Sequence, residues 1–390
     1  ELLKAAPNGW VMEYYIGKDY SLGGITLLCR FDGQRVTMAS QMSEADETVS
    51  SLYSVKSEQA TMLSFDTYNY LVHYFGQPQG SMSDDPNGTL GGDYEFIISS
   101  ASAERIELKG KKYGNRIVMK ALTEDQTWKQ YLTKIKKVED DAFFYEYDLL
   151  MDGLYTGQMI RSNYTFIVTY YDEIGKVHQK TVPFMFTADG LRFHEPVTID
   201  GQTMQNFVWK NELISFVCTD EGATGVKLAG VYTAGYQSYD YYPGTYQMDF
   251  YRLNDETGQL EVASQEVRLL KNEDGKSYWL KGLEYDILVM YDKPRGGLSV
   301  SPQLLEKVQG GYVYLAMWDV MNDYVLRNKS IGLISYATTN GIYLVDNGVW
   351  MGEVSGFIFG VYNSQEEDAA FIGYTDAVAS IRLVKKTIEE

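Results

Sequence analysis

The sequence is short of the residues that build most metal centres and disulfide frameworks. It has two cysteines, Cys29 and Cys218, and three histidines, His73, His178 and His194, in 390 residues. No two histidines stand at the spacing of paired metal ligands, and two distant cysteines do not make a disulfide framework. We therefore expect no metal site and no cofactor. Each cysteine falls on the apolar face of a predicted strand, which predicts buried thiols and leaves a disulfide as the alternative.

Motifs of nucleophilic and phosphate chemistry are also missing. There is no Gly-x-Ser-x-Gly elbow, and no glycine-rich loop leads into a helix. His194 precedes Glu195, but neighbouring positions on a strand point to opposite faces, so we do not expect the two to share a site. These absences predict a protein that is not an enzyme. A hydrolase that uses unrecognised carboxylates stays open as an alternative.

Positive charge and long apolar runs are scarce. The chain has 34 Lys and Arg against 53 Asp and Glu, which gives a formal net charge of −19. Such a charge repels nucleic acid and anionic membrane surfaces. No apolar run reaches the ~18 residues of a membrane-spanning helix. We expect no nucleic-acid partner, and contact with a membrane only through a lipid anchor outside this chain.

Short alternating runs closed by Gly, Asn or Asp are abundant, and they predict an all-β protein. In residues 23–40, Ile25, Leu27, Cys29 and Phe31 fall on one face, and an Asp-Gly turn follows. Eight such strands are predicted before residue 123, which suggests a meander that closes into a barrel or a sandwich. We expect fewer than about a fifth of the residues to be helical.

One amphipathic helix interrupts the strands, at about 123–138. Thr123 and Gln126 fit a capping box, and an apolar stripe follows, which is formed by Trp128, Tyr131, Leu132, Ile135 and Val138. Strands return after the helix, so it is interpreted as an insertion in the first domain.

Small and polar residues at 219–225 mark the best domain boundary. We predict two β-barrel or β-sandwich domains. The first, residues 1–220, carries the inserted helix, and the second spans residues 226–390.

Tyrosine is the main surplus, with 33 in the chain. Tyrosine combines a large apolar face with a hydroxyl group, a combination that suits binding loops. The segment 232–246 is rich in tyrosine and is broken by Gly, Ser and Pro. Its candidate ligand-binding residues are Tyr236, Tyr239, Tyr241 and Tyr242. The alternative is that these tyrosines clad a sheet and seal a domain interface.

Several segments in the first half carry a family resemblance. They include "APNGWVMEYY", "GGITLLCRFDGQRVTMAS", "LSFDTYNYLVHYF", "GGDYEFII", "IELKGKKYGNRIVM" and "FTADGLRFHEPVTIDGQTMQNFVW". In this order they resemble an uncharacterised lipoprotein family of gut Bacteroidetes, well over residues 1–218 and weakly beyond. The resemblance implies an exported lipoprotein in the periplasm or at the outer-membrane surface, often encoded near glycan-uptake systems. It implies no catalytic residues, and the lipid-bearing cysteine of such proteins would lie upstream of Glu1.

The sequence therefore predicts a non-enzymatic, lipid-anchored β-protein that binds extracellular glycan or assists a surface uptake complex. Two alternatives remain beside the hydrolase. One is a barrel that carries a small apolar ligand, which needs inward positions too small to fill the interior. The other is a structural or adhesive surface protein.

Overall fold

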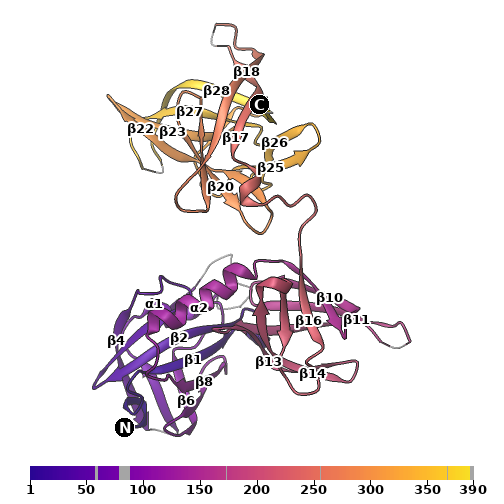
Figure 1. The fold of residues 1–390 in the computed structure, drawn as a ribbon. Coiled ribbons are helices and arrows are strands. Elements are labelled where there is room, and N and C mark those ends of the chain that lie inside the picture. The colour runs from indigo at the N-terminus through magenta and orange to yellow at the C-terminus, as the bar shows by residue number, and fades with distance from the viewer. Residues whose placement is uncertain (58–59, 79–87, 173, 255, 367, 387–390) are drawn as a thin grey trace. The chain divides into compact units, whose positions relative to one another are not determined.

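The computed structural model describes residues 1–390 except 58–59, 79–87, 173, 255, 367 and 387–390. Strands dominate the described chain, which divides into two compact units, Glu1–Val231 and Tyr232–Glu390 (Figure 1). The predicted all-β class is confirmed. Within the described residues, no helix combines the length and the apolar character needed to cross a membrane.

The first eight strands close into a barrel, as the alternating pattern predicts. Gly33, at φ +57°, forms the tight turn between the second and third strands. The barrel closes because β1 pairs with both β2 and β8. Its strands are β1 Trp10–Ile16, β2 Gly23–Asp32, β3 Arg35–Ser40, β4 Val49–Ser57, β5 Thr61–Phe65, β6 Glu95–Ala101, β7 Arg105–Gly110 and β8 Arg116–Ala121. A short helix, α1 (Tyr70–His73), lies between β5 and β6.

A second closed barrel follows within the same unit. Its last strand, β16, pairs with its first, β9. The sequence pattern assigns residues 226–231 to the next domain, but they form β16, so the first unit ends at Val231 rather than at 219–225. The strands are β9 Glu146–Met151, β10 Leu154–Ser162, β11 Thr165–Tyr171, β12 Val177–Phe186, β13 Gly190–Ile199, β14 Gln202–Lys210, β15 Ser215–Cys218 and β16 Val226–Val231.

The amphipathic helix, α2 (Trp128–Asp141), connects these two barrels rather than being inserted in one. Its capping box is formed by Thr127 and Gln130, four residues after the predicted box. Leu132 packs with residues of the first barrel, whereas Ile135 and Val138 pack in the core of the second. The helix therefore ties the two barrels together (Figure 1).

The two barrels of the first unit also touch directly, through β2 and β12. Gly23 has a φ of +71°, and a side chain there would overlap the backbone of Tyr164. Every residue of β1 is buried, because one face lines the first core and the other is covered. This close packing fixes the groove that runs between β8 and β13.

The second unit is one large sheet that curls on itself. Its strands follow the order β17-β18-β19-β20-β21-β25-β26-β28, and β17 also pairs with β28, which closes a ring. The strands β27, β23 and β22 extend the sheet beyond β28, and β24 pairs with β23. The strands are β17 Gly244–Leu253, β18 Leu260–Lys271, β19 Ser277–Lys281, β20 Ile287–Asp292, β21 Gly297–Val300, β22 Gln303–Val308, β23 Gly311–Asp319, β24 Tyr324–Leu326, β25 Leu333–Thr338, β26 Gly341–Asp346, β27 Gly356–Tyr362 and β28 Phe371–Lys385.

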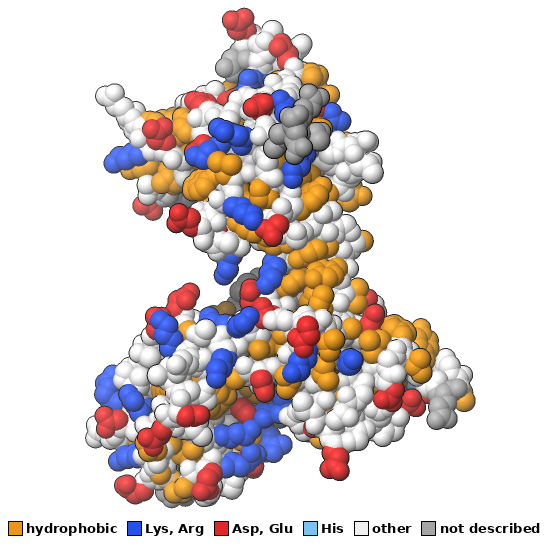
Figure 2. Space-filling model, viewed as in Figure 1, with side chains coloured by type: hydrophobic (Ala, Val, Ile, Leu, Met, Phe, Trp, Pro, Cys, Tyr) orange, Lys and Arg blue, Asp and Glu red, His pale blue; other side chains and the backbone are white. Residues whose placement is uncertain are grey.

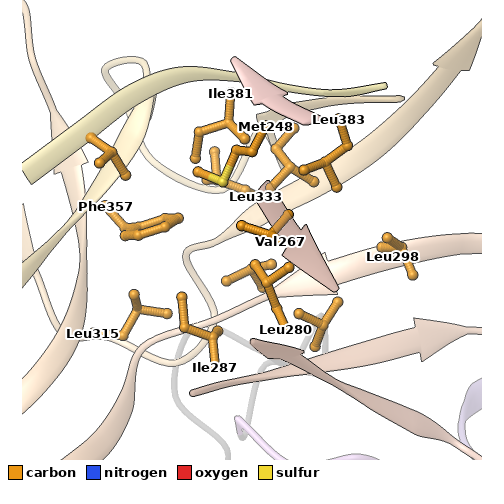
Figure 3. Packing of buried hydrophobic residues seen from close by; sticks show 14 of the residues in the cluster. Met248, Val267, Leu280, Ile287, Leu298, Leu315, Leu333, Phe357, Ile381 and Leu383 are labelled. Carbon is orange, nitrogen blue, oxygen red and sulfur yellow. The ribbon is translucent and has the colours of Figure 1, made fainter. Parts of the chain in front are cut away.

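Large side chains fill the interiors of all three β-structures. Trp10 and Phe96 are fully buried in the first barrel, and Phe166 and Phe184 in the second. Figure 3 shows aliphatic and aromatic side chains converging in the second unit from several strands. Cys29 and Cys218 are free and buried in the separate cores of the first and second barrels, which confirms the prediction of buried thiols.

Candidate binding cleft in the first unit

A cleft of about 570 Å³ lies in the first unit, between the outer faces of its two barrels. The first barrel contributes residues from β1, β7 and β8, and the second contributes residues from β13 and β14. We call this hollow the basic cleft because four cationic side chains line it: Arg105, Arg116, Lys120 and Arg192. Two carboxylates, Glu13 and Glu195, also line it, so its charged walls carry a net positive charge in a chain of −19.

Strand alternation places one row of the cleft's cations. Arg116, Val118 and Lys120 are separated by steps of two residues, so they point to the outer face of β8 while Ile117 and Met119 fill the core. Lys120 lies directly opposite Arg105 on β7. Figure 2 shows Lys and Arg side chains gathered in the same region of the first unit.

Glu13 joins the two walls of the cleft. It is only 8% exposed, on a strand that is otherwise apolar or aromatic. Its carboxylate pairs with Lys120 at 2.9 Å, from the first barrel, and with Arg192 from the second. Burial opposes the charge of Arg192, but the Glu13 carboxylate outweighs it, so the pKa of Arg192 is raised. Glu13 therefore supplies the partner that the partly buried charge of Arg192 needs within the cleft.

A wide irregularity in β13 brings His194 and Glu195 to the same cleft. Arg192 pairs with Asn206 and Val197 with Met204, so four residues of β13 lie opposite the single residue Gln205. The Gln205 side-chain amide donates to the backbone carbonyls of Phe193 and His194, at 3.2 and 3.4 Å. The expectation that His194 and Glu195 point apart is wrong, because strict alternation fails across a bulge.

Aromatic rings hold His194 in place. Its ring lies 4.3 Å from the ring of Tyr15 and 4.1 Å from that of Tyr20, centroid to centroid. Burial lowers the pKa of His194, and Arg116 and Arg192 lower it further, while Glu195 opposes them. These effects together favour the neutral form of His194.

The tyrosines predicted to bind ligand lie in the second unit, near the start of β17. Tyr242 is 1% exposed, and its hydroxyl donates to the carbonyl of Gly296 at 2.8 Å. The Tyr239 ring stacks on Tyr278, and its hydroxyl donates to a backbone carbonyl. These contacts place both side chains in the packing of the second unit.

The other two tyrosines, Tyr241 and Tyr236, have different surroundings. Tyr241 is 39% exposed, and the Lys385 ammonium group lies 5.3 Å from the centre of its ring. The hydroxyl of Tyr236 accepts a hydrogen bond from Tyr291 at 3.1 Å. The four tyrosines thus differ in exposure, and the structure does not bring them together as one exposed platform.

Sequence reasoning missed the residues of the basic cleft, although two signals for them are present. The pattern Arg116-x-Val118-x-Lys120 puts two cations on the outer face of a strand. Glu13 is an acidic residue within an apolar and aromatic run. Neither signal indicates which other strand faces these residues, because β8 and β13 are far apart in the sequence.

Comparisons with known proteins place the basic cleft within one family domain. A family model described as "Domain of unknown function (DUF4302)" matches residues 1–211, more than half of the chain. The chain belongs to this family. The residues that line the basic cleft all lie within this match. A second model, described as "Domain of unknown function" (DUF4987), matches residues 219–359.

Other comparisons add no functional information. A search of curated proteins finds no match to this chain. Among solved structures, one titled "The Structure of Intact Ap-TbpB (N and C lobes)" is 11% identical, with a TM-score of 0.12. That alignment covers 93% of this chain and 67% of the other, and at this score it supports no conclusion about fold or function. The DUF4302 match is therefore the finding that bears on the cleft.

Proposed function

We propose that the protein is a non-enzymatic binding protein for extracellular glycan, and that the basic cleft is its binding surface. The observation that carries this proposal is the open, polar cleft between two barrels that contact each other directly. Its walls combine charged side chains with the half-buried ring of His194, which packs on the buried ring of Tyr15. Hydrogen-bonding groups beside ring surfaces suit the mixed polar and apolar faces of a sugar.

The proposed location follows from the resemblance of the N-terminal half to exported lipoproteins of gut Bacteroidetes. We propose a lipid-anchored protein in the periplasm or at the outer-membrane surface, where it binds glycan or assists an uptake complex. Membership of the DUF4302 family is compatible with this role, because the family's description assigns no other.

The carrier of a small apolar ligand is the less favoured alternative. Such a carrier needs inward positions that leave a lumen. In the described barrels, inward positions hold large side chains, among them Trp10, Tyr14, Tyr147 and Phe166. The packing therefore offers this alternative no support.

A glycan array probed with the purified chain tests the proposed function. Val118 lies between Arg116 and Lys120 on the wall of the cleft, so Val118→Trp should obstruct the hollow and abolish binding to every glycan that the parent chain binds. Val55→Trp is the matched control, because Val55 is 49% exposed on another strand of the same barrel. Binding by the control but not by Val118→Trp supports the proposal. No glycan bound by the parent chain, or equal binding by both variants, would overturn it.

A further inference from the structure

We propose that the basic cleft selects acidic oligosaccharides, with carboxylate or sulfate groups that contact Arg116 and Lys120. This inference rests on the proposed function and names the ligand class. Uronic acids and sulfate esters both carry a group with anionic oxygens on a sugar ring, and the cations of the cleft would bind this group. Arg presents paired donors to such groups, and Lys presents a point charge.

The register of β7 and β8 places cations directly opposite each other. Lys120 lies directly opposite Arg105, and Arg116 lies directly opposite Lys109. Like charges in direct cross-strand positions destabilise a sheet. Two such pairs flank the pair of Glu107 and Val118 on the same face, in a chain that has far more acidic than basic residues. A function that needs concentrated positive charge explains why the fold tolerates them.

Acidic partners neutralise this positive charge only in part. Lys120 pairs with Glu13, and Arg105 pairs with Glu107 at 2.9 Å. Arg116 is exposed, and no ion pair to it is found in the part of the chain that the structure describes. Its guanidinium group is therefore available to an anionic ligand without breaking an existing pair.

The spacing of Arg116 and Lys120 along β8 suits an extended ligand. Arg116 and Lys120 are four residues apart on an extended strand, which separates their Cα atoms by roughly 13 Å. Unless both side chains bend toward each other along the strand, a single small anion cannot contact them together. A chain of sugars with repeated acidic groups can, so the geometry favours an oligosaccharide over a free sulfate or phosphate ion.

Calorimetry on the full chain tests this inference with four probes of similar length. They are an oligogalacturonate, a heparin-derived oligosaccharide, a neutral mannooligosaccharide and a single-stranded oligonucleotide. We expect at least one acidic sugar to bind and the neutral sugar to bind at least ~10-fold more weakly. The affinity for the acidic sugar should fall several-fold when salt rises from about 50 to about 300 mM, because the cations are accessible to solvent.

Matched variants test whether the acidic sugar binds at the basic cleft. Arg116→Gln should lower the affinity for the acidic sugar by ~10-fold, since it removes a charged hydrogen-bond donor. Lys109→Gln, across from Arg116, should cause a smaller loss in the same direction. Arg268→Gln is the control, because Arg268 is exposed in the second unit and its loss changes the net charge equally. Melting temperatures should stay close to that of the parent chain, since these side chains are exposed.

The outcomes separate the two proposals. Equal binding of neutral and acidic sugars, with no effect of Arg116→Gln, overturns the selectivity but keeps the proposed function. Stronger binding of the oligonucleotide than of either acidic sugar overturns the selectivity as well. Binding of none of the three sugars overturns both proposals.

Discussion

At the scale of single residues, Glu13 sets how much positive charge the basic cleft carries. A carboxylate that is 8% exposed on a continuously buried strand needs partners, because burial of an unpaired charge is costly. Lys120 and Arg192 supply them from two different barrels. The same contact neutralises part of the positive charge that we propose for ligand binding. Glu13 therefore stabilises the fold at some expense to the charge of the cleft.

Replacing Glu13 by Gln should destabilise the protein and strengthen its binding of acidic sugar. Arg192 would lose its carboxylate partner while staying mostly buried, and breaking a buried pair costs about 3 kcal/mol. At the same time both cations become available to the ligand. Denaturant unfolding and calorimetry measure the two effects.

Glu107→Gln is the control for Glu13→Gln. Glu107 pairs with Arg105 at the surface, where an ion pair contributes at most about 1 kcal/mol. A Glu13→Gln variant as stable as Glu107→Gln would show that the buried pair does not hold the two barrels together.

At the scale of elements, α2 shows how two similar signals compete. Thr-x-x-Gln occurs twice in succession, at Thr123 and at Thr127, and both satisfy a capping box. The structure uses the second, where Thr127 accepts from the backbone N–H of Gln130. The side chain of Thr123 bonds to Asp125 instead. The apolar stripe begins with Trp128, so the box next to it starts the helix.

Thr127→Ala should therefore lower the free energy of unfolding by about 1 kcal/mol, the usual cost of losing an N-cap. Thr123→Ala should change it by less than about 0.5 kcal/mol, because Thr123 is outside the helix. Urea unfolding of the two variants shows which of the two capping boxes begins the helix. A larger loss of unfolding free energy from Thr123→Ala than from Thr127→Ala would show that the helix begins at the position predicted from sequence.

The tyrosine-rich segment before β17 gives a second prediction about an element. Tyr242→Ala should cost ~3–5 kcal/mol, because it removes a fully buried aromatic ring. Tyr241→Ala should cost under about 1 kcal/mol, because Tyr241 is partly exposed. Thermal unfolding of the two variants measures both losses of stability. Equal, small losses would mean that Tyr242 is not packed in the core.

Local patterns predicted the strands and the class of fold, but not how the strands close. Alternation at Ile25, Leu27 and Cys29 is visible in the sequence because it repeats within one strand. The pairing of β16 with β9, which makes a separate second barrel, joins residues about 80 positions apart and leaves no local trace. The cleft was missed for the same reason, since it needs β8 beside a bulged β13.

At the scale of the whole molecule, the division at Val231 makes a prediction for proteolysis. Tyr232 is 46% exposed and directly follows the last strand of the second barrel. Limited chymotrypsin digestion should cut there first and release two fragments that each unfold cooperatively. The fragment 1–231 should keep the affinity for acidic sugar. First cleavage after an aromatic residue inside a strand of either unit would contradict the division that the structure shows.

The most direct test of the central claim is an NMR titration of His194 in the full chain, with and without an acidic oligosaccharide. Burial, Arg116 and Arg192 lower the pKa of His194 in the free protein against the opposing effect of Glu195, and the rings of Tyr15 and Tyr20 enclose it. An anion in the basic cleft should raise this pKa, so binding should take up protons and strengthen as the pH falls through the range in which His194 titrates. The account predicts that the His194 signal moves on binding while those of His73 and His178 stay in place. Saturation with ligand that leaves the His194 signal and its pKa unchanged would contradict it.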